Sequence, residues 1–94
     1  MRILPNDILP SYWKQKPYQG AKKHLQLWEA RVMAASWRTN EDVKAAIPSV
    51  DFKNGKALFN IFGNRFRLVA VITYPLQVVT VVWFGTHADY DREV

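Results

Sequence analysis

Two short segments of the chain carry side chains that suit chemistry on a phosphate group. Asn60, Arg65 and Arg67 lie close together in the first segment, and His87 and Tyr90 lie in the second. RNA cleavage needs a general base near the 2′-hydroxyl, an acid near the leaving oxygen, and cations that stabilise charge on the phosphate. His87 has an ordinary pKa suited to proton transfer at neutral pH. The arginines can bind phosphate bidentately, and Tyr90 can stack on a base or donate a proton.

Each of these residues also has a simpler structural explanation, which the sequence leaves open. A single histidine at the end of a strand, such as His87, is often only a surface or hydrogen-bonded residue. Two arginines at alternate positions of a strand commonly face solvent or form ion pairs, here with Asp89 or Asp91. Asn60 can simply satisfy a backbone group near a turn.

Three strands in the second half of the chain are expected to position these residues, because turn signals separate three apolar runs. The dipeptide Gly63-Asn64 predicts a two-residue hairpin turn, since both residues tolerate positive φ, and Pro75-Leu76 predicts a second turn. Gly85 is expected to end the sheet, and the residues after it are expected to form a tail. The expected strands are residues 56–62, 65–74 and 77–84.

The register of these strands follows from the two turns. The first turn places Asn60 opposite Arg67, and the second places Arg67 opposite Phe84. This face of the sheet is then polar at one end, and the chain leaving the third strand brings His87 to the same end. The other face is apolar throughout and is expected to receive the helices. Its residues are Ala57, Phe59, Ile61, Phe66, Leu68, Ala70, Ile72, Val79, Val81 and Trp83.

The first half of the chain is expected to be mainly helical, after a short edge strand at residues 2–4. A first helix is expected from about Pro10 to Lys16. Apolar residues recur every three or four positions from Ala21, which predicts a second helix. On this helix Lys22 and Lys23 form either a solvated face or a phosphate contact.

A third short helix is predicted with Thr39 or Asn40 as its N-cap. Acidic residues follow directly in its first turn, where the helix dipole favours them. Pro48 is expected to end this helix.

Length and composition indicate one small domain that covers residues 1–94. The formal net charge of +5 favours a polyanion or an acidic protein as partner. The absence of cysteine excludes a disulfide scaffold and a cysteine-ligated zinc, and neither a signal peptide nor an apolar run of roughly 18 residues is apparent. We therefore expect a cytoplasmic protein without membrane association, metal or cofactor.

At the residues discussed above, the chain resembles the HigB family of type II toxins. Residues 59–68 (FNIFGNRFRL) and 86–91 (THADYD) carry the resemblance, with the expected apolar hairpin between them. Residues 42–49 and Trp37 also match the family pattern. The resemblance covers most of the chain and is weakest before Tyr12. In one departure, Phe62-Gly63 stands where the family commonly has two glycines.

The resemblance implies an α+β, RelE-like fold with N-terminal helices packed on one face of a small antiparallel sheet. It also implies a metal-independent mRNA interferase, which is an endoribonuclease that cuts translated mRNA on the ribosome and so inhibits translation. The expected partners are a HigA-type helix-turn-helix antitoxin, mRNA and the ribosome, with DNA contacted only indirectly through the antitoxin complex. The expected catalytic residues are His87, Arg67, Arg65 and Tyr90. The expected RNA-binding residues are Asn60, Asn64, Phe62, Lys56, Lys22 and Lys23.

Two other functions fit the same residues. The basic patch can belong to a non-catalytic module that binds RNA or the ribosome without cutting, or to a basic interaction domain that docks on an acidic protein.

Overall fold

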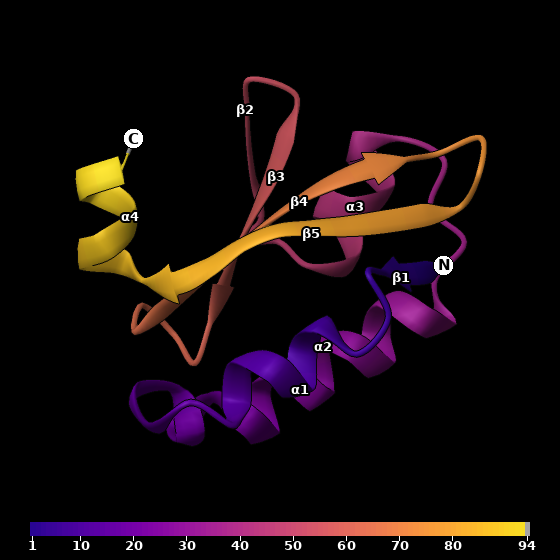
Figure 1. Ribbon diagram of the computed structural model, residues 1–94. Helices are drawn as coiled ribbons and strands as arrows, with labels where there is room; N and C mark the ends of the chain where they lie inside the picture. Colours follow the sequence, from indigo (N-terminus) through magenta and orange to yellow (C-terminus); the bar gives the residue numbers. More distant parts are fainter. Residues whose placement is uncertain (94) are drawn as a thin grey trace.

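The molecule is built on a five-stranded sheet, with helices packed against one face of the sheet (Figure 1). One further helix, at the C-terminus, lies at the far end of the sheet. The computed structural model describes the backbone of residues 1–93 and the side chains of residues 1–92. The order of the strands in the sheet is β1-β5-β4-β3-β2. The elements in chain order are β1 (Arg2–Leu4), α1 (Ile8–Trp13), the 3-10 helix η1 (Lys16–Ala21), α2 (Lys22–Ala34), α3 (Asn40–Ala46), β2 (Asp51–Lys53), β3 (Lys56–Ile61), β4 (Phe66–Thr73), β5 (Val78–Thr86) and α4 (His87–Glu93).

The predicted α+β class is confirmed, and the N-terminal helices pack on one face of the sheet. Leu25, Trp28 and Val32 of α2 are buried in one core cluster with Phe59 and Leu68 of the sheet. The sheet is mixed, because β1 pairs with β5 in parallel while the other pairs are antiparallel. None of the helices within the described residues is long and apolar enough to cross a membrane.

The third predicted helix is capped as its sequence suggests. The Thr39 side chain accepts a hydrogen bond from the Asp42 backbone N–H at 3.2 Å, and the Asp42 carboxylate accepts one from Thr39 N–H at 3.3 Å. The first helix begins and ends earlier than predicted, since α1 runs from Ile8 to Trp13 and η1 carries the chain through Pro17. A proline is tolerated there because it lies in the first turn of η1, where its missing N–H costs nothing.

The register between β3 and β4 agrees with the prediction at the residues that matter for the site. Asn60 pairs with Arg67 across the hairpin. The turn is closed by a hydrogen bond of 3.2 Å from Arg65 N–H to the Phe62 carbonyl. Positive φ occurs at Phe62 (56°) and Gly63 (63°), however, and not at Asn64 as expected. The two positions where the family commonly has glycine are therefore the two left-handed positions of this turn.

A β-bulge between β4 and β5 makes the prediction for the last strand partly wrong. The pairing follows the expected register as far as Ala70 with Val81, then omits Val82, so that Arg67 pairs with Gly85 rather than Phe84. Trp83 therefore lies on the outer face, although it was expected in the core. Phe84 lies in the core, where its ring is 5.1 Å from Tyr12, 5.2 Å from Tyr18 and 5.6 Å from Phe66. This aromatic burial favours the bulged arrangement.

Two elements of the structure were not predicted from the sequence. Strand β2 pairs with β3 through a turn at Asn54 (φ 53°) and Gly55 (φ 78°), and this dipeptide is a recognised hairpin signal. The expected tail is in fact helix α4, and the Thr86 hydroxyl accepts a hydrogen bond of 3.1 Å from the Asp89 N–H in its first turn. The threonine and the acidic residue three positions later were a capping signal in the sequence.

Candidate functional site

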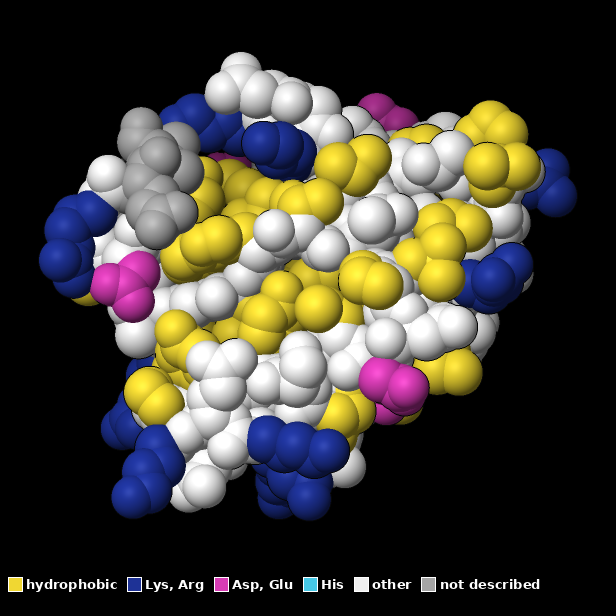
Figure 2. Space-filling model, in the orientation of Figure 1, with side chains coloured by type: hydrophobic (Ala, Val, Ile, Leu, Met, Phe, Trp, Pro, Cys, Tyr) yellow, Lys and Arg dark blue, Asp and Glu magenta, His cyan; other side chains and the backbone are white. Residues whose placement is uncertain are grey.

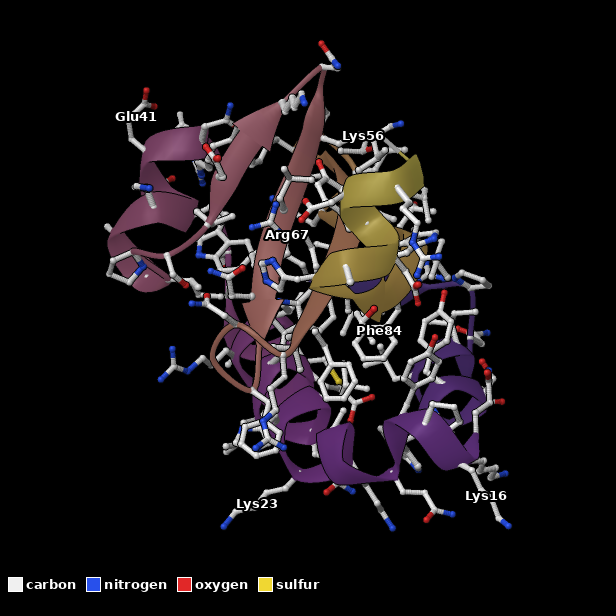
Figure 3. The ribbon with its side chains drawn as sticks, turned by 90° about the vertical axis from the view of Figure 1, so that its left-hand side faces the viewer. Lys16, Lys23, Glu41, Lys56, Arg67 and Phe84 are labelled. Atoms are coloured by element: carbon white, nitrogen blue, oxygen red, sulfur yellow. The ribbon has the colours of Figure 1, made fainter. Side chains whose placement is uncertain are left out.

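Three of the predicted site residues meet at one oxygen atom, on the outer face of the sheet. Asn60 of β3 lies directly opposite Arg67 of β4, and its side-chain Oδ1 accepts a hydrogen bond of 3.1 Å from Arg67 Nη2. His87, the first residue of α4, lies with its Nε2 3.0 Å from the same Oδ1. Figure 3 shows Arg67 on the sheet beside α4. We refer to Asn60, Arg67 and His87 as the triad.

The triad fixes the tautomer of a neutral His87. An amide oxygen only accepts hydrogen bonds, so His87 Nε2 must carry the proton that it shares with Asn60 Oδ1. The other ring nitrogen, Nδ1, then holds the free lone pair of the neutral imidazole. His87 is therefore arranged to accept a proton at Nδ1.

The surroundings of His87 favour its neutral form. Burial of the imidazole lowers its pKa below the ordinary value of 6.5, and the positive charge of Arg67 lowers it further, while Asp91 acts in the opposite direction. Because both larger effects disfavour the imidazolium, His87 is neutral near pH 7 and can act as a base there.

Arg67 is held in place while part of its guanidinium is unpaired. Its Cζ lies 4.8 Å from the centre of the Tyr90 ring, a cation–π contact. Its Nε is buried and has no hydrogen-bond partner among the described residues. A buried donor without a partner costs about 1–3 kcal/mol. The side chain as a whole is only half-buried, so the rest of the guanidinium can still donate to a phosphate.

Tyr90 reaches the site through its ring. Its side chain is buried against Leu58 and Val69, with Trp83 packed beside it. The Tyr90 ring thus supports the guanidinium of Arg67. This cation–π contact is the part that Tyr90 plays in the site.

Arg65, Phe62 and Asn64 lie in the turn after β3 and form a separate group. The guanidinium of Arg65 is 4.6 Å from the Phe62 ring, and His24 of α2 stacks on that ring at 4.1 Å with 11° between the planes. Arg65 touches the triad through its backbone, whose carbonyl accepts a hydrogen bond of 3.4 Å from His87 N–H. Asn64 is exposed. The two arginines that were expected to hold one phosphate together therefore have different contacts.

None of the three candidate lysines has a recorded contact with the triad, and Lys56 lies on the sheet whereas Lys22 and Lys23 are neighbours on α2. Lys56 begins β3 and lines a hollow beside Tyr90, whereas Lys22 lies at the start of α2 with its Nζ 5.9 Å from the Trp13 ring. Lys23 is exposed on α2. Figure 3 shows Lys56 and Lys23 at opposite ends of the molecule, so they cannot contact the same phosphate.

Trp83 is the residue near the site that the sequence pattern misplaced. The bulge turns its indole to the outer face, 5.9 Å from the Tyr90 ring. The indole also covers Gly85, where an added Cβ would lie 2.7 Å from the ring. A glycine inside a strand commonly marks a bulge or a close approach, so Gly85 was the signal for this arrangement.

Comparison with known protein families identifies a match that covers most of the chain. A family model described as HigB toxin, the RelE-like toxic component of a toxin-antitoxin system, matches residues 21–93. The matched region includes the triad, Tyr90 and the turn after β3, and the α+β architecture agrees with a RelE-like fold. A search of curated proteins found no match.

Proposed function

This chain belongs to the HigB family of RelE-like toxins, and we propose that it is an endoribonuclease that cuts translated mRNA. As a member of this family it is the toxic component of a toxin–antitoxin system, and an antitoxin is its partner. The observation that carries the proposal is the triad, in which one amide oxygen holds a neutral histidine beside a partly unpaired arginine. A base next to a phosphate-binding cation is what cleavage of RNA requires.

In the proposed reaction His87 Nδ1 takes the proton of the ribose 2′-hydroxyl. The 2′-oxygen then bonds to the neighbouring phosphorus, and the bond from phosphorus to the 5′-oxygen breaks. Water protonates the leaving 5′-oxygen, and the hydroxide that this leaves takes the proton from His87 Nδ1, which returns the base to its neutral form. The products are a 2′,3′-cyclic phosphate and a 5′-hydroxyl. Arg67 stabilises the negative charge that builds up on the phosphate oxygens, and Asn60 holds Arg67 and His87 in register. No metal takes part in this scheme.

The ribosome has a specific part in this proposal. Within the described residues, the triad holds one group suited to proton transfer near pH 7 and one cation for the phosphate, Arg67. Orientation by the ribosome supplies the missing alignment, which can account for a large share of a reaction barrier. Because the ribosome is the proposed target, the proposed setting is the cytoplasm. The proposed antitoxin is a HigA-type helix-turn-helix protein, and the toxin–antitoxin complex contacts DNA through it.

Cleavage mapping of a defined mRNA in a purified translation system tests this function. Wild-type protein should cut the transcript only with ribosomes present, and His87→Ala should lower cutting by at least about 100-fold, the scale of general base catalysis. His24→Ala, the variant of the other histidine, is the matched control and should cut normally. Thermal unfolding of each variant verifies the fold.

Two outcomes would contradict the proposal. Normal cutting by a folded His87→Ala variant would remove His87 from the mechanism. Intact transcripts with arrested protein synthesis would instead indicate a module that binds RNA or the ribosome without cutting.

A further inference from the structure

A hollow of about 420 Å³ lies on the outer face of the sheet, next to the triad. Its floor is formed by Leu58, Val69, Trp83 and Tyr90, and Lys53 and Lys56 stand at its rim. We call it the Trp83 pocket. Figure 2 shows this face of the molecule, where hydrophobic side chains gather over β4 and β5 and basic side chains lie towards the margins.

The β-bulge creates the Trp83 pocket. Because Val82 is the extra residue, the next residue turns outward and its indole lies on this face. Gly85 leaves the space into which the indole folds, since a Cβ there would be 2.7 Å from the ring. Two local features of β5 thus place Trp83 in the pocket, and α4 adds Tyr90.

The Trp83 pocket is continuous with the candidate site through one side chain. Tyr90 lines the pocket and stands 5.9 Å from Trp83, with 60° between the ring planes. The same ring lies 4.8 Å from the guanidinium of Arg67. A molecule in the pocket is therefore separated by one aromatic ring from a phosphate bound at Arg67.

The chemistry of the lining selects a flat ligand that carries negative charge. The half-buried indole of Trp83 offers a stacking surface for a nucleobase, and two lysines at the rim can contact its phosphates. Within the described residues, no carboxylate lines the pocket. A base attached to a phosphate meets all three conditions.

The size of the pocket favours a nucleotide over a protein segment. Small-molecule pockets occupy roughly 300–1,000 Å³, and the Trp83 pocket lies within that range. A stable protein interface instead buries roughly 1,200–2,000 Å², far more surface than one such hollow provides.

We propose that the Trp83 pocket holds the base of the nucleotide next to the cleaved phosphate and sets the base preference of cleavage. This inference rests on the proposed ribonuclease function. Trp83 is then a specificity-determining residue, and Lys53 and Lys56 guide the RNA backbone past it.

Replacement of the indole tests the stacking contact. Trp83→Leu keeps an apolar side chain but removes the aromatic face, and Trp83→Phe keeps a smaller aromatic face. In ribosome-dependent cleavage mapping, Trp83→Leu should reduce cutting at the preferred positions about tenfold, the scale of one lost base stack. The remaining cuts should be spread more evenly over the four bases. Trp83→Phe should retain most of the wild-type pattern.

Replacement of the rim lysines tests the backbone contact. The double variant Lys53→Gln/Lys56→Gln should cut more slowly than wild type at every position, because phosphate contacts carry no base preference. The double variant Lys14→Gln/Lys16→Gln removes the same charge at exposed positions outside the pocket and is the matched control.

The possible results separate this inference from the function on which it rests. Absence of cutting by the wild type overturns the proposed function and the role of the pocket together. Wild-type cutting with an unchanged cleavage pattern in folded Trp83→Leu overturns only the pocket. If Trp83→Leu cuts normally but resists its antitoxin, the pocket is a protein-docking site and the inference is wrong.

Discussion

At the scale of single residues, the site depends on how Asn60 Oδ1 is shared. This oxygen accepts from Arg67 and His87 at nearly equal distances, 3.1 and 3.0 Å. The arrangement keeps the proton of His87 on Nε2 and keeps the guanidinium close enough to lower the pKa of His87. Asn60 is therefore proposed as a positioning residue, which acts through its two neighbours.

The pH dependence of cleavage follows from the direction of the His87 pKa shift. The proposed base must be neutral, and its pKa lies below 6.5, so the rate should rise with pH below that value and level off near neutrality. Asn60→Asp places a carboxylate beside the imidazole, which favours the charged form and raises the pKa. We expect the acidic limb of the rate profile to move to higher pH, and cutting at pH 7 to fall about tenfold or more.

Proton NMR titration of His87 gives an independent measurement of the same effect. The His24→Ala background leaves one histidine signal, so no assignment is needed. If Asn60→Asp leaves the pKa of His87 unchanged, the amide does not control the protonation of that histidine.

Phe62 shows a conflict between backbone and side chain at a single position. Its φ of 56° is a left-handed conformation, which costs a non-glycine residue about 1 kcal/mol or more. Its ring is held by His24 at 4.1 Å. The stack offsets the strain, which explains how phenylalanine is accommodated where the family commonly has glycine.

Two substitutions at Phe62 separate the cost of the left-handed backbone from the stabilisation by the stack on His24. Phe62→Ala and Phe62→Gly both lose the stack on His24, but only alanine keeps the left-handed strain. Phe62→Gly should therefore be more stable than Phe62→Ala by about 1 kcal/mol, measured by urea unfolding. Equal stabilities would show that the turn relaxes to another conformation without the ring.

At the scale of elements, the bulge in β5 determines which aromatic residue faces the site. Gly85→Ala should destabilise the protein by about 1–3 kcal/mol, because the new methyl group collides with the indole of Trp83. The cost should largely disappear in a Trp83→Leu background, where the space is free. A double-mutant cycle from chemical unfolding measures this coupling, and additive effects would contradict the proposed contact.

Helix α4 presents His87 and Tyr90, so its first turn should matter for activity. Thr86 accepts from Asp89 N–H at 3.1 Å, and Thr39 accepts from Asp42 N–H at 3.2 Å in the cap of α3. Substitution of either threonine by valine should lower stability by about 1 kcal/mol. Only Thr86→Val should also slow cleavage, because α3 carries no residue of the triad. Equal cleavage by the two variants would show that α4 keeps its position without this cap.

The sequence was a good guide where the chemistry of a turn fixed the register. The turn at Gly63-Asn64 correctly placed Asn60 opposite Arg67, which is the contact on which the triad depends. The pattern failed at Trp83 and Phe84, because both residues are apolar and alternation cannot decide which of them faces the core. The packing of Phe84 against Tyr12 and Tyr18 decides it, and in the sequence Gly85 marked only that this strand is irregular.

The candidate site was predictable to a different degree for each residue. Convergence of His87 with Arg67 follows from the order of the strands, which the sequence indicates. The separate stack of Arg65 on Phe62 and His24 depends on α2 meeting the hairpin turn, and this is a tertiary contact with no local signal. The Trp83 pocket likewise requires the bulge and α4 together.

At the scale of the whole molecule, the net charge is positive and favours a polyanionic partner. The chain has 13 lysines and arginines against 8 acidic residues. In the view of Figure 3, Lys56 lies above Arg67 and Lys23 lies below it. A polyanion that passes over Arg67 would meet basic side chains on both sides, which suits a strand of RNA held by the ribosome.

The salt dependence of cleavage can decide whether α2 takes part in this contact. For single-stranded nucleic acid, each lysine that binds a phosphate contributes about 0.7 to the slope of log affinity against log salt. If Lys22 and Lys23 both bind phosphate, the double variant Lys22→Gln/Lys23→Gln should reduce the slope by about 1.4.

The measurement compares wild type, this variant and Lys14→Gln/Lys16→Gln at constant magnesium. The quantity measured is the ribosome concentration that gives half-maximal cutting. The two double variants have the same net charge, so a general effect of charge would change both slopes equally, and α2 would then be only a solvated face. A smaller slope in Lys22→Gln/Lys23→Gln alone would extend the RNA path from the triad to α2.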